Sequence, residues 1–114
     1  MEILDLSVIK RDGRREPYIR EKLEKGIKES LEKRPYTMDS FKKLIHKIER
    51  DIQKVKKNEL TSGDLGEIVM KQLKRYDKVA YIRFASIYRS FEDVKTFQKE
   101  LDKLIKKNKK GKKG

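Results

Sequence analysis

The hydrophobic positions of this chain repeat with the period of an α-helix from residue 19 onward. Ile19, Leu23, Ile27 and Leu31 recur at every fourth position, a spacing that places side chains on one face of a helix. The series stops at Lys33-Arg34-Pro35, because proline disfavours helical backbone in the residue before it. The pattern therefore predicts a first helix over residues 19–33.

Three further helical segments follow, and each is preceded by a residue that can cap it. Thr37 is suited to cap a second helix that runs to about Lys56, Thr61 or Ser62 a third, and Asp77 a fourth. We expect a loop at residues 57–63. The apolar positions lie three and four residues apart: Phe41, Leu44, Ile45, Ile48, Ile52 and Val55 in the second helix, then Leu65, Ile68, Val69 and Leu73 in the third.

The fourth segment is the densest in apolar residues, so we expect it to be the central element of the core. It carries Val79, Ala80, Ile82, Phe84, Ala85, Ile87, Tyr88 and Phe91. A further series either extends this helix or begins a fifth: Val94, Phe97, Leu101 and Leu104.

The N-terminal residues have the character of β-strands. Residues 3–9, ILDLSVI, are rich in strand formers, and Asp12-Gly13 predicts a two-residue hairpin turn because glycine tolerates a positive φ. Residues 14–18 would return as the second strand, with Pro17 at a sheet edge. The expected fold is α+β and mainly α, with an N-terminal β-hairpin packed on a bundle of four to five helices in one domain, residues 1–102.

Composition limits the classes of function. A chain of 114 residues is the size of one domain. It has no apolar run long enough for a membrane span and no signal-peptide pattern, so we expect a cytoplasmic protein without a membrane partner. With no cysteine and a single histidine, His46, we expect neither disulfides nor a zinc site. No catalytic constellation, phosphate-loop motif or dinucleotide motif is present, so we expect no enzyme activity.

The net charge of +13 is distributed unevenly. Residues 103–114, KLIKKNKKGKKG, contain seven lysines and no acidic residue. Such a segment has too little apolar surface to offset its ordering entropy, so we expect a disordered basic tail. The tail either solubilises the protein or makes weak, non-specific contacts with nucleic acid or an acidic partner.

The stretch VIKRDGRREPY, residues 8–18, is a candidate anion site. On a strand, Val8 and Lys10 face one way while Ile9 and Arg11 face the other. Lys22 follows at the start of the first helix, where the helix dipole and free amide groups favour an anion. Lys10, Lys22 and this helix start can together hold a polyphosphate, with Val8 against a base. A basic hairpin also protects an edge strand from aggregation, so the residues alone leave both interpretations open.

Several segments resemble a known family. VIKRDGRREPYIREKL resembles the signature of the ATP-cone, a small regulatory domain with a β-hairpin and about four helices that binds ATP or dATP without using it as a substrate. LEKRP and VMKQLKRYDKVAYIRFASIYRSFEDVKTF resemble the ATP-cone of the bacterial transcriptional repressor of ribonucleotide reductase genes more closely than the cones fused to the reductases. The resemblance covers residues 7–100.

The resemblance implies roles for individual hairpin and first-helix residues. Lys10, Arg11 and Lys22 fall where ATP-cones contact phosphates. Val8 and Glu16 match positions that line the adenosine pocket.

Further roles are implied beyond the first helix. Ser62 matches a position of the base and ribose pocket in reductase cones, whereas Gly66 stands where those cones often have a histidine, a departure that bears on discrimination of the ribose. Tyr81, Arg83 and Tyr88 belong to the repressor-like segment. Their side chains either stack on a base or meet a phosphate, or else pack in the core and between helices.

One departure from the repressor family concerns DNA binding. In that family a zinc ribbon with four cysteines precedes the cone and binds DNA, whereas this chain has no cysteine and about seven residues before the cone begins. We therefore expect no zinc-ribbon DNA binding. The chain is either a cone excised from a longer repressor or a natural stand-alone cone.

The favoured interpretation is a non-catalytic regulatory domain that binds ATP or dATP, with or without Mg²⁺, and acts in the transcriptional or allosteric control of ribonucleotide reductase. YIRFASIYRSF has apolar residues on more than one helix face, so we expect a homo-oligomer. A reductase or a separate zinc-ribbon protein is a candidate partner. The alternative is a small basic helical module that binds nucleic acid or an acidic partner through its lysine-rich tail.

Overall fold

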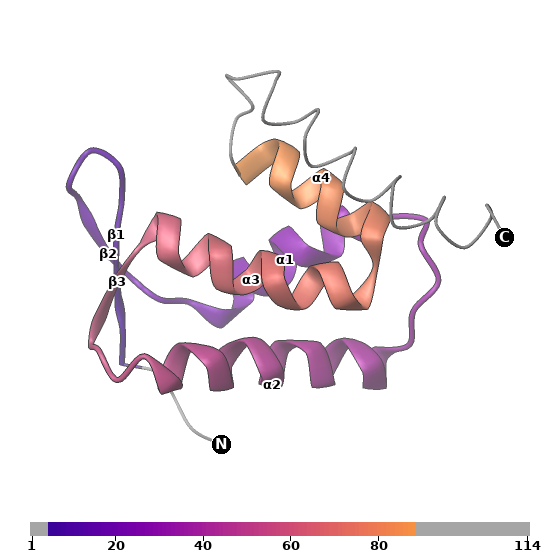
Figure 1. The fold of residues 1–114 in the computed structure, drawn as a ribbon, viewed down its shortest axis with the longest axis horizontal. Helices are drawn as coiled ribbons and strands as arrows, with labels where there is room; N and C mark the ends of the chain where they lie inside the picture. The colour runs from indigo at the N-terminus through magenta and orange to yellow at the C-terminus, as the bar shows by residue number, and fades with distance from the viewer. Residues whose placement is uncertain (1–4, 89–114) are drawn as a thin grey trace, which may run out of the picture.

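The structure is a computed structural model that describes residues 5–88 (Figure 1). This part of the chain contains three strands, β1 (Ser7–Ile9), β2 (Arg15–Pro17) and β3 (Glu59–Thr61), and four helices, α1 (Arg20–Ser30), α2 (Met38–Lys54), α3 (Ser62–Tyr76) and α4 (Lys78–Tyr88). The predicted α+β class, with an N-terminal hairpin on a mainly helical domain, is confirmed. The tail and the proposed extension or fifth helix lie outside the described residues.

The β-hairpin closes through a three-residue loop, so the predicted two-residue turn is wrong. The Lys10 N–H donates to the Arg14 carbonyl at 2.7 Å, and the Gly13 N–H donates to the Lys10 carbonyl at 2.9 Å. Arg11 and Asp12 thus occupy the centre of the turn, and Gly13 follows in the left-handed region at φ 89°. Hydrogen bonds from the Arg14 backbone and side chain lower the pKa of the Asp12 carboxyl.

β3 is an element that the apolar pattern does not indicate, because residues 57–63 were expected to form a loop. It pairs in parallel with β1, with Leu60 opposite Val8. The strand order is β2-β1-β3, so Pro17 lies in an edge strand as predicted. A three-residue strand is too short to show an alternating pattern, and its pairing partner lies about fifty residues earlier in the chain.

The first two helices end earlier than the pattern predicts. Lys33 and Lys56 have φ values of 62° and 57°, and this left-handed backbone cannot continue a right-handed helix. Glycine usually marks such a position, so lysine gave no stop signal. The predicted starts of the later helices are confirmed. Thr37 and Thr61 cap α2 and α3 with their side chains, and at the start of α4 the Asp77 carboxylate accepts a hydrogen bond from the Ala80 N–H at 2.9 Å.

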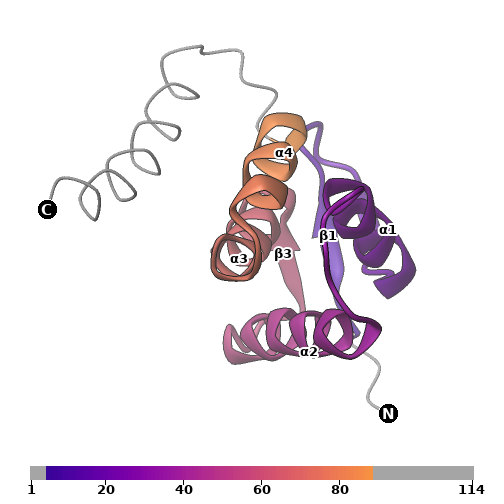
Figure 2. The same ribbon diagram turned by 90° about the vertical axis from the view of Figure 1, so that its right-hand side faces the viewer.

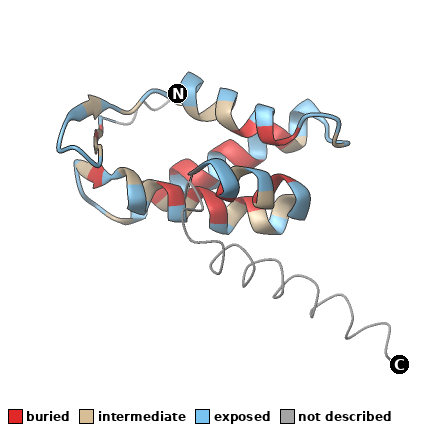
Figure 3. Ribbon diagram, turned by 90° about the horizontal axis from the view of Figure 1, so that it is seen from above, coloured by how far each residue is buried: buried red, intermediate tan, exposed pale blue. Residues whose placement is uncertain are grey.

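The hydrophobic core lies where the helices meet. α3 packs against both α2 and α4, and α4 packs against α1, with α2 crossing below this group (Figure 2). Within residues 5–88 the prediction that α4 is the central element is wrong, because α2 provides more of the buried side chains. Buried and exposed positions alternate along the helices, as the colours of Figure 3 show. The buried apolar residues of α2 are Phe41, Leu44, Ile45, Ile48 and Ile52, whereas those of α4 are Ala80, Tyr81 and Ala85.

α2 has 17 residues, and none of the described helices is both long enough and apolar enough to cross a bilayer.

Candidate functional site

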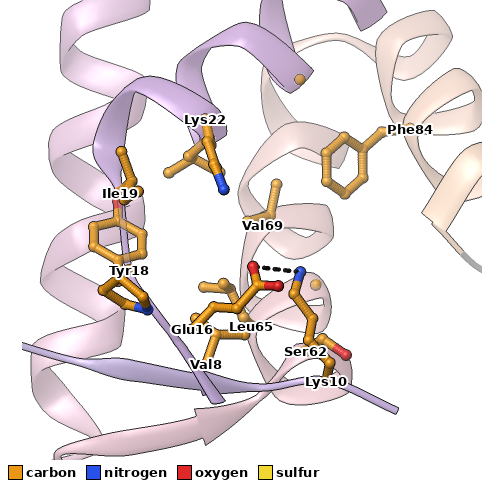
Figure 4. Close-up of a pocket in the computed structure, with 14 residues that line it drawn as sticks. Val8, Lys10, Glu16, Tyr18, Ile19, Lys22, Ser62, Leu65, Val69 and Phe84 are labelled. Carbon is orange, nitrogen blue, oxygen red and sulfur yellow. Dashed lines mark ion pairs between the residues drawn. The ribbon is translucent and has the colours of Figure 1, made fainter. Parts of the chain in front are cut away.

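A cavity of about 260 Å³ opens where the β-hairpin, α1, α3 and α4 meet (Figure 4). Its apolar wall includes side chains from each of these elements: Val8, Leu23, Leu65, Val69 and Phe84. Its polar groups include Lys10, Glu16, Lys22 and Ser62. An apolar cavity with a few convergent polar groups is the usual form of a small-molecule site.

The sheet register sets the floor of this cavity. Val8 is buried in the central strand, and Lys10 follows on the same side of β1. Glu16 lies opposite Val8 in the antiparallel register, so its side chain shares that face. The structure therefore brings three of the predicted hairpin residues to one cavity.

A hydrogen-bonded cluster fixes the start of α1 to α2. The Tyr18 hydroxyl donates to Glu49 Oε2 at 2.8 Å, and Arg20 Nε donates to the same oxygen at 2.9 Å. Glu49 is 7% exposed, so its charge is compensated by Arg20 rather than by water. Burial and the Glu49 hydrogen bond raise the pKa of Tyr18, and the same carboxylate raises the pKa of Arg20. The cluster holds Ile19 and Lys22 against the cavity.

The cationic groups of the cavity differ in how they are paired. Lys10 Nζ lies 3.9 Å from Glu16 Oε1, and Arg14 Nη1 lies 3.4 Å from the other oxygen of Glu16. Lys22 points into the cavity from α1, across from the Lys10–Glu16 pair (Figure 4). Within residues 5–88 no carboxylate forms an ion pair with Lys22. Its charge is therefore available to an anionic ligand.

Two helix N-termini also face the cavity. Ile19 and Lys22 line it from the first turn of α1, and Ser62 and Leu65 line it from the first turn of α3. The N-cap of α1 is Ile19, whose side chain cannot accept a hydrogen bond from the first-turn amides. Aligned amide dipoles at these ends favour an anion and add to the charge of the two lysines.

The remaining predicted residues lie elsewhere. Arg11 lines a neighbouring hollow with Ile9, Thr61 and Gly63, and Lys10 and Ser62 border both hollows. Tyr81 is buried in the core, with Lys74 Nζ 5.7 Å from its ring centroid.

Arg83 closes the end of α1 rather than the cavity. Its Nη1 donates to the carbonyls of Ser30 and Glu32, at 3.2 Å and 2.7 Å. The Tyr88 side chain lies outside the described part of the chain. The structure thus shows Tyr81 and Arg83 in packing contacts, and their part in nucleotide binding stays a prediction.

Several cavity residues were missed as site residues. Tyr18 and Phe84 looked like strand and core positions, and their place in the cavity wall depends on elements distant in sequence. Gly26 also lines the cavity from inside α1, where glycine is an unfavourable residue and therefore a noticeable one in the sequence. A Cβ at Gly26 would lie 4.0 Å from Phe84 Cε2, so this glycine stands beside the aromatic wall.

The described residues hold no cluster of three metal-ligating side chains. His46 is exposed on α2, as expected of a polar residue on the side of a helix.

The hairpin, the helices and the basic, apolar-walled cavity define a small ligand-binding domain. A family model for the ATP cone domain matches residues 6–94, and the chain belongs to that family. The resemblance read from the hairpin signature is thereby confirmed.

Similar curated proteins are named transcriptional repressor NrdR. The protein of Geotalea uraniireducens is 49% identical over 106 residues, which cover 93% of this chain and 70% of that relative. The protein of Lachnoclostridium phytofermentans is 47% identical over 105 residues, which cover 92% of this chain and 69% of the relative. The Acetivibrio thermocellus protein is 48% identical, with 92% and 70% covered.

Proposed function

We propose that this protein is a non-catalytic sensor that binds ATP or dATP in the cavity and takes part in the control of ribonucleotide reductase genes. The observation that carries the proposal is the convergence of an apolar wall, two lysines and two helix N-termini on one cavity. Membership of the ATP cone domain family supports adenine nucleotides as the ligand. Because the relatives are named transcriptional repressors, we place the protein in the cytoplasm and assign it no turnover.

The two kinds of lining suggest how a nucleotide lies. The base packs against the apolar wall, with Val8 below it and Phe84 beside it. Lys22 and the α1 N-terminus attract the phosphates, and Lys10 exchanges Glu16 for a phosphate oxygen. At about 260 Å³ the cavity is slightly smaller than the usual ligand site of about 300 Å³ or more. The phosphate chain therefore extends toward Arg11 in the adjoining hollow.

Discrimination between ATP and dATP requires a group that reads the ribose. A ligand shifts a conformational equilibrium only by its differential affinity for the two states. Ser62 and Glu16 are polar groups of the cavity that can hydrogen-bond a ribose hydroxyl. Gly66 lines the same wall without a side chain, so it leaves space where a larger residue would contact the sugar.

Isothermal titration calorimetry with ATP, dATP and GTP tests the proposal. We expect both adenine nucleotides to bind and GTP to bind more weakly, and a phosphate-release assay to show no steady turnover. No binding of either adenine nucleotide at millimolar concentration would remove the proposal, and sustained phosphate release would make the protein an ATPase.

The comparisons favour this sensor over the alternative of a basic module that acts through its tail, because the matching family model is that of an ATP cone. We propose that Mg²⁺ binds together with the triphosphate. The same calorimetry with and without Mg²⁺ tests whether it is needed.

A further inference from the structure

A second hollow lies between α2 and α3, separate from the cavity. Its volume is about 540 Å³, and its cationic lining comes from both helices: Lys43, Lys47, Arg50 and Lys54 on α2, with Lys71 and Arg75 on α3. Among its lining residues Asp51 is the one carboxylate. We refer to this surface as the basic groove. It shares α3 with the nucleotide cavity but none of that cavity's lining residues.

The cations of the basic groove follow the helix axes. Those of α2 occur at intervals of four, three and four residues, so they form one stripe about 16 Å long at a rise of about 1.5 Å per residue. Two hydrogen bonds join the walls: Ser40 Oγ and Tyr76 Oη lie 2.6 Å apart, and Gln72 Nε2 donates to Asp51 Oδ2 at 2.7 Å. The two rows of charge are therefore held in a fixed relation.

Within the described part of the chain, most of this charge has no carboxylate partner. Lys43 forms an exposed pair with Asp39 at 3.4 Å, and Lys54 lies 4.0 Å from Asp51. In residues 5–88 no carboxylate forms an ion pair with the other four groove cations, Lys47, Arg50, Lys71 and Arg75. Like charges gathered in a concave surface repel each other and attract a polyanion.

We infer that the basic groove binds the sugar–phosphate backbone of duplex DNA without regard to sequence. A stripe of about 16 Å matches the length of duplex axis along which one strand carries about five phosphates, at about 3.4 Å of axis each, more than a single nucleotide offers. Lysine and arginine side chains make contacts of this kind with phosphates, which position a protein on DNA but do not read bases. The similar proteins named transcriptional repressors are consistent with a DNA partner.

The groove favours a duplex over a single strand. Single-strand sites stack bases on aromatic side chains. Tyr76 is the aromatic residue of this groove, its hydroxyl is bonded to Ser40, and Leu44 is buried beneath. A phosphate backbone is thus matched by the six cations of the groove, whereas the bases of a single strand find one aromatic ring, Tyr76, among its lining residues.

Fluorescence anisotropy of the full chain with a labelled duplex of arbitrary sequence, titrated at several salt concentrations, tests this inference. The groove variant is Lys47→Gln with Lys71→Gln, and the matched control is Lys42→Gln with Lys25→Gln, which removes the same charge from exposed positions outside the groove. We expect the groove variant to lose about tenfold or more in duplex affinity. The slope of log affinity against log salt concentration should become shallower by about 1.8, because each of two lost phosphate contacts contributes about 0.9. The control should keep the wild-type slope.

Thermal unfolding and ATP calorimetry of both variants check that the fold and the nucleotide site are intact, so failure of the nucleotide proposal and failure of this one are separable. Equal losses of duplex affinity in the groove and control variants would overturn the inference, because binding would then depend on net charge or on the tail. Absence of duplex binding at low salt, or tighter binding of a single strand, would also overturn it. If the groove variant lost more affinity for an acidic peptide than for the duplex, the groove would be assigned to a protein partner instead.

Discussion

Lys22 and Lys25 show how one turn of a helix separates a ligand contact from a solvated charge. Both lysines are exposed, but Lys22 lines the cavity and Lys25 does not. We predict that Lys22→Ala weakens ATP binding by about 1–3 kcal/mol, the loss of a charge-assisted contact, and that Lys25→Ala leaves it nearly unchanged. Calorimetry measures both.

Lys10→Ala should act in the same direction but near the lower end of that range, because a phosphate must compete with Glu16 for this ammonium group. Circular dichroism should show an unchanged fold in all three variants. Wild-type affinity in both Lys10→Ala and Lys22→Ala would place the nucleotide elsewhere.

Tyr18 provides a test of the cluster beneath the cavity. Burial and Glu49 raise its pKa, so the folded state holds the phenol proton more tightly than the unfolded state does. The resulting stability is complete below the ordinary tyrosine pKa of about 10 and is lost as the pH rises toward the folded-state pKa. At about pH 11 we predict equal phenolate absorbance in the wild type and Tyr18→Phe, and one additional phenolate in the wild type after denaturation. One fewer phenolate in the folded variant at that pH would contradict this.

At the scale of elements, two glycines have opposite roles. Gly13 has a φ of 89°, and a Cβ at this position would meet no atom within 4 Å. Only its backbone conformation therefore requires glycine. Gly26 lies inside α1, where a methyl group would make an ordinary contact with Phe84. The hairpin loop therefore needs its glycine, and the helix does not.

We predict that Gly13→Ala lowers the free energy of unfolding by about 1–2 kcal/mol, because a side chain destabilises left-handed backbone. Gly26→Ala should raise it by about 0.5–1 kcal/mol, because alanine loses less entropy in a helix. Urea unfolding of both variants measures these changes. A loss of stability in Gly26→Ala would show that Phe84 cannot accept the contact.

At the scale of the whole molecule, the exposed apolar residues bear on assembly. On α4, Val79 is 38% and Ile87 is 75% exposed, although both were expected in the core. Exposed apolar side chains mark an interaction surface where they form a contiguous patch. The homo-oligomer expected from the sequence remains a prediction, and α4 is the element on which we locate its contact.

We predict that the protein forms at least a dimer and that the mass of the assembly differs between ATP and dATP. The Ile87→Lys variant should form an assembly of lower mass than the exposed control His46→Lys. Light scattering of the protein alone and with each nucleotide measures this. The same monomeric mass in all three conditions would leave a hetero-partner, such as a reductase or a zinc-ribbon protein, as the remaining route of regulation.

Much of the fold was determined by local sequence. The helical period located α2, α3 and α4, and Thr37, Thr61 and Asp77 cap them, because a side chain and an amide three residues apart need no tertiary contact to meet. The alternation along β1 likewise placed Val8 and Lys10 on one face. The signature around this strand was enough to indicate the family that the comparisons show.

Other features were decided only by tertiary structure. β3 exists because Leu60 pairs beside Val8, and Phe84 enters the cavity wall because α4 packs against α1. Tyr81 and Arg83 share a helix with Phe84, yet one is buried in the core and the other bonds to the end of α1. Local periodicity specifies which residues share a helix face. Which face meets a ligand depends on contacts between segments far apart in the chain, and these form only when the domain folds.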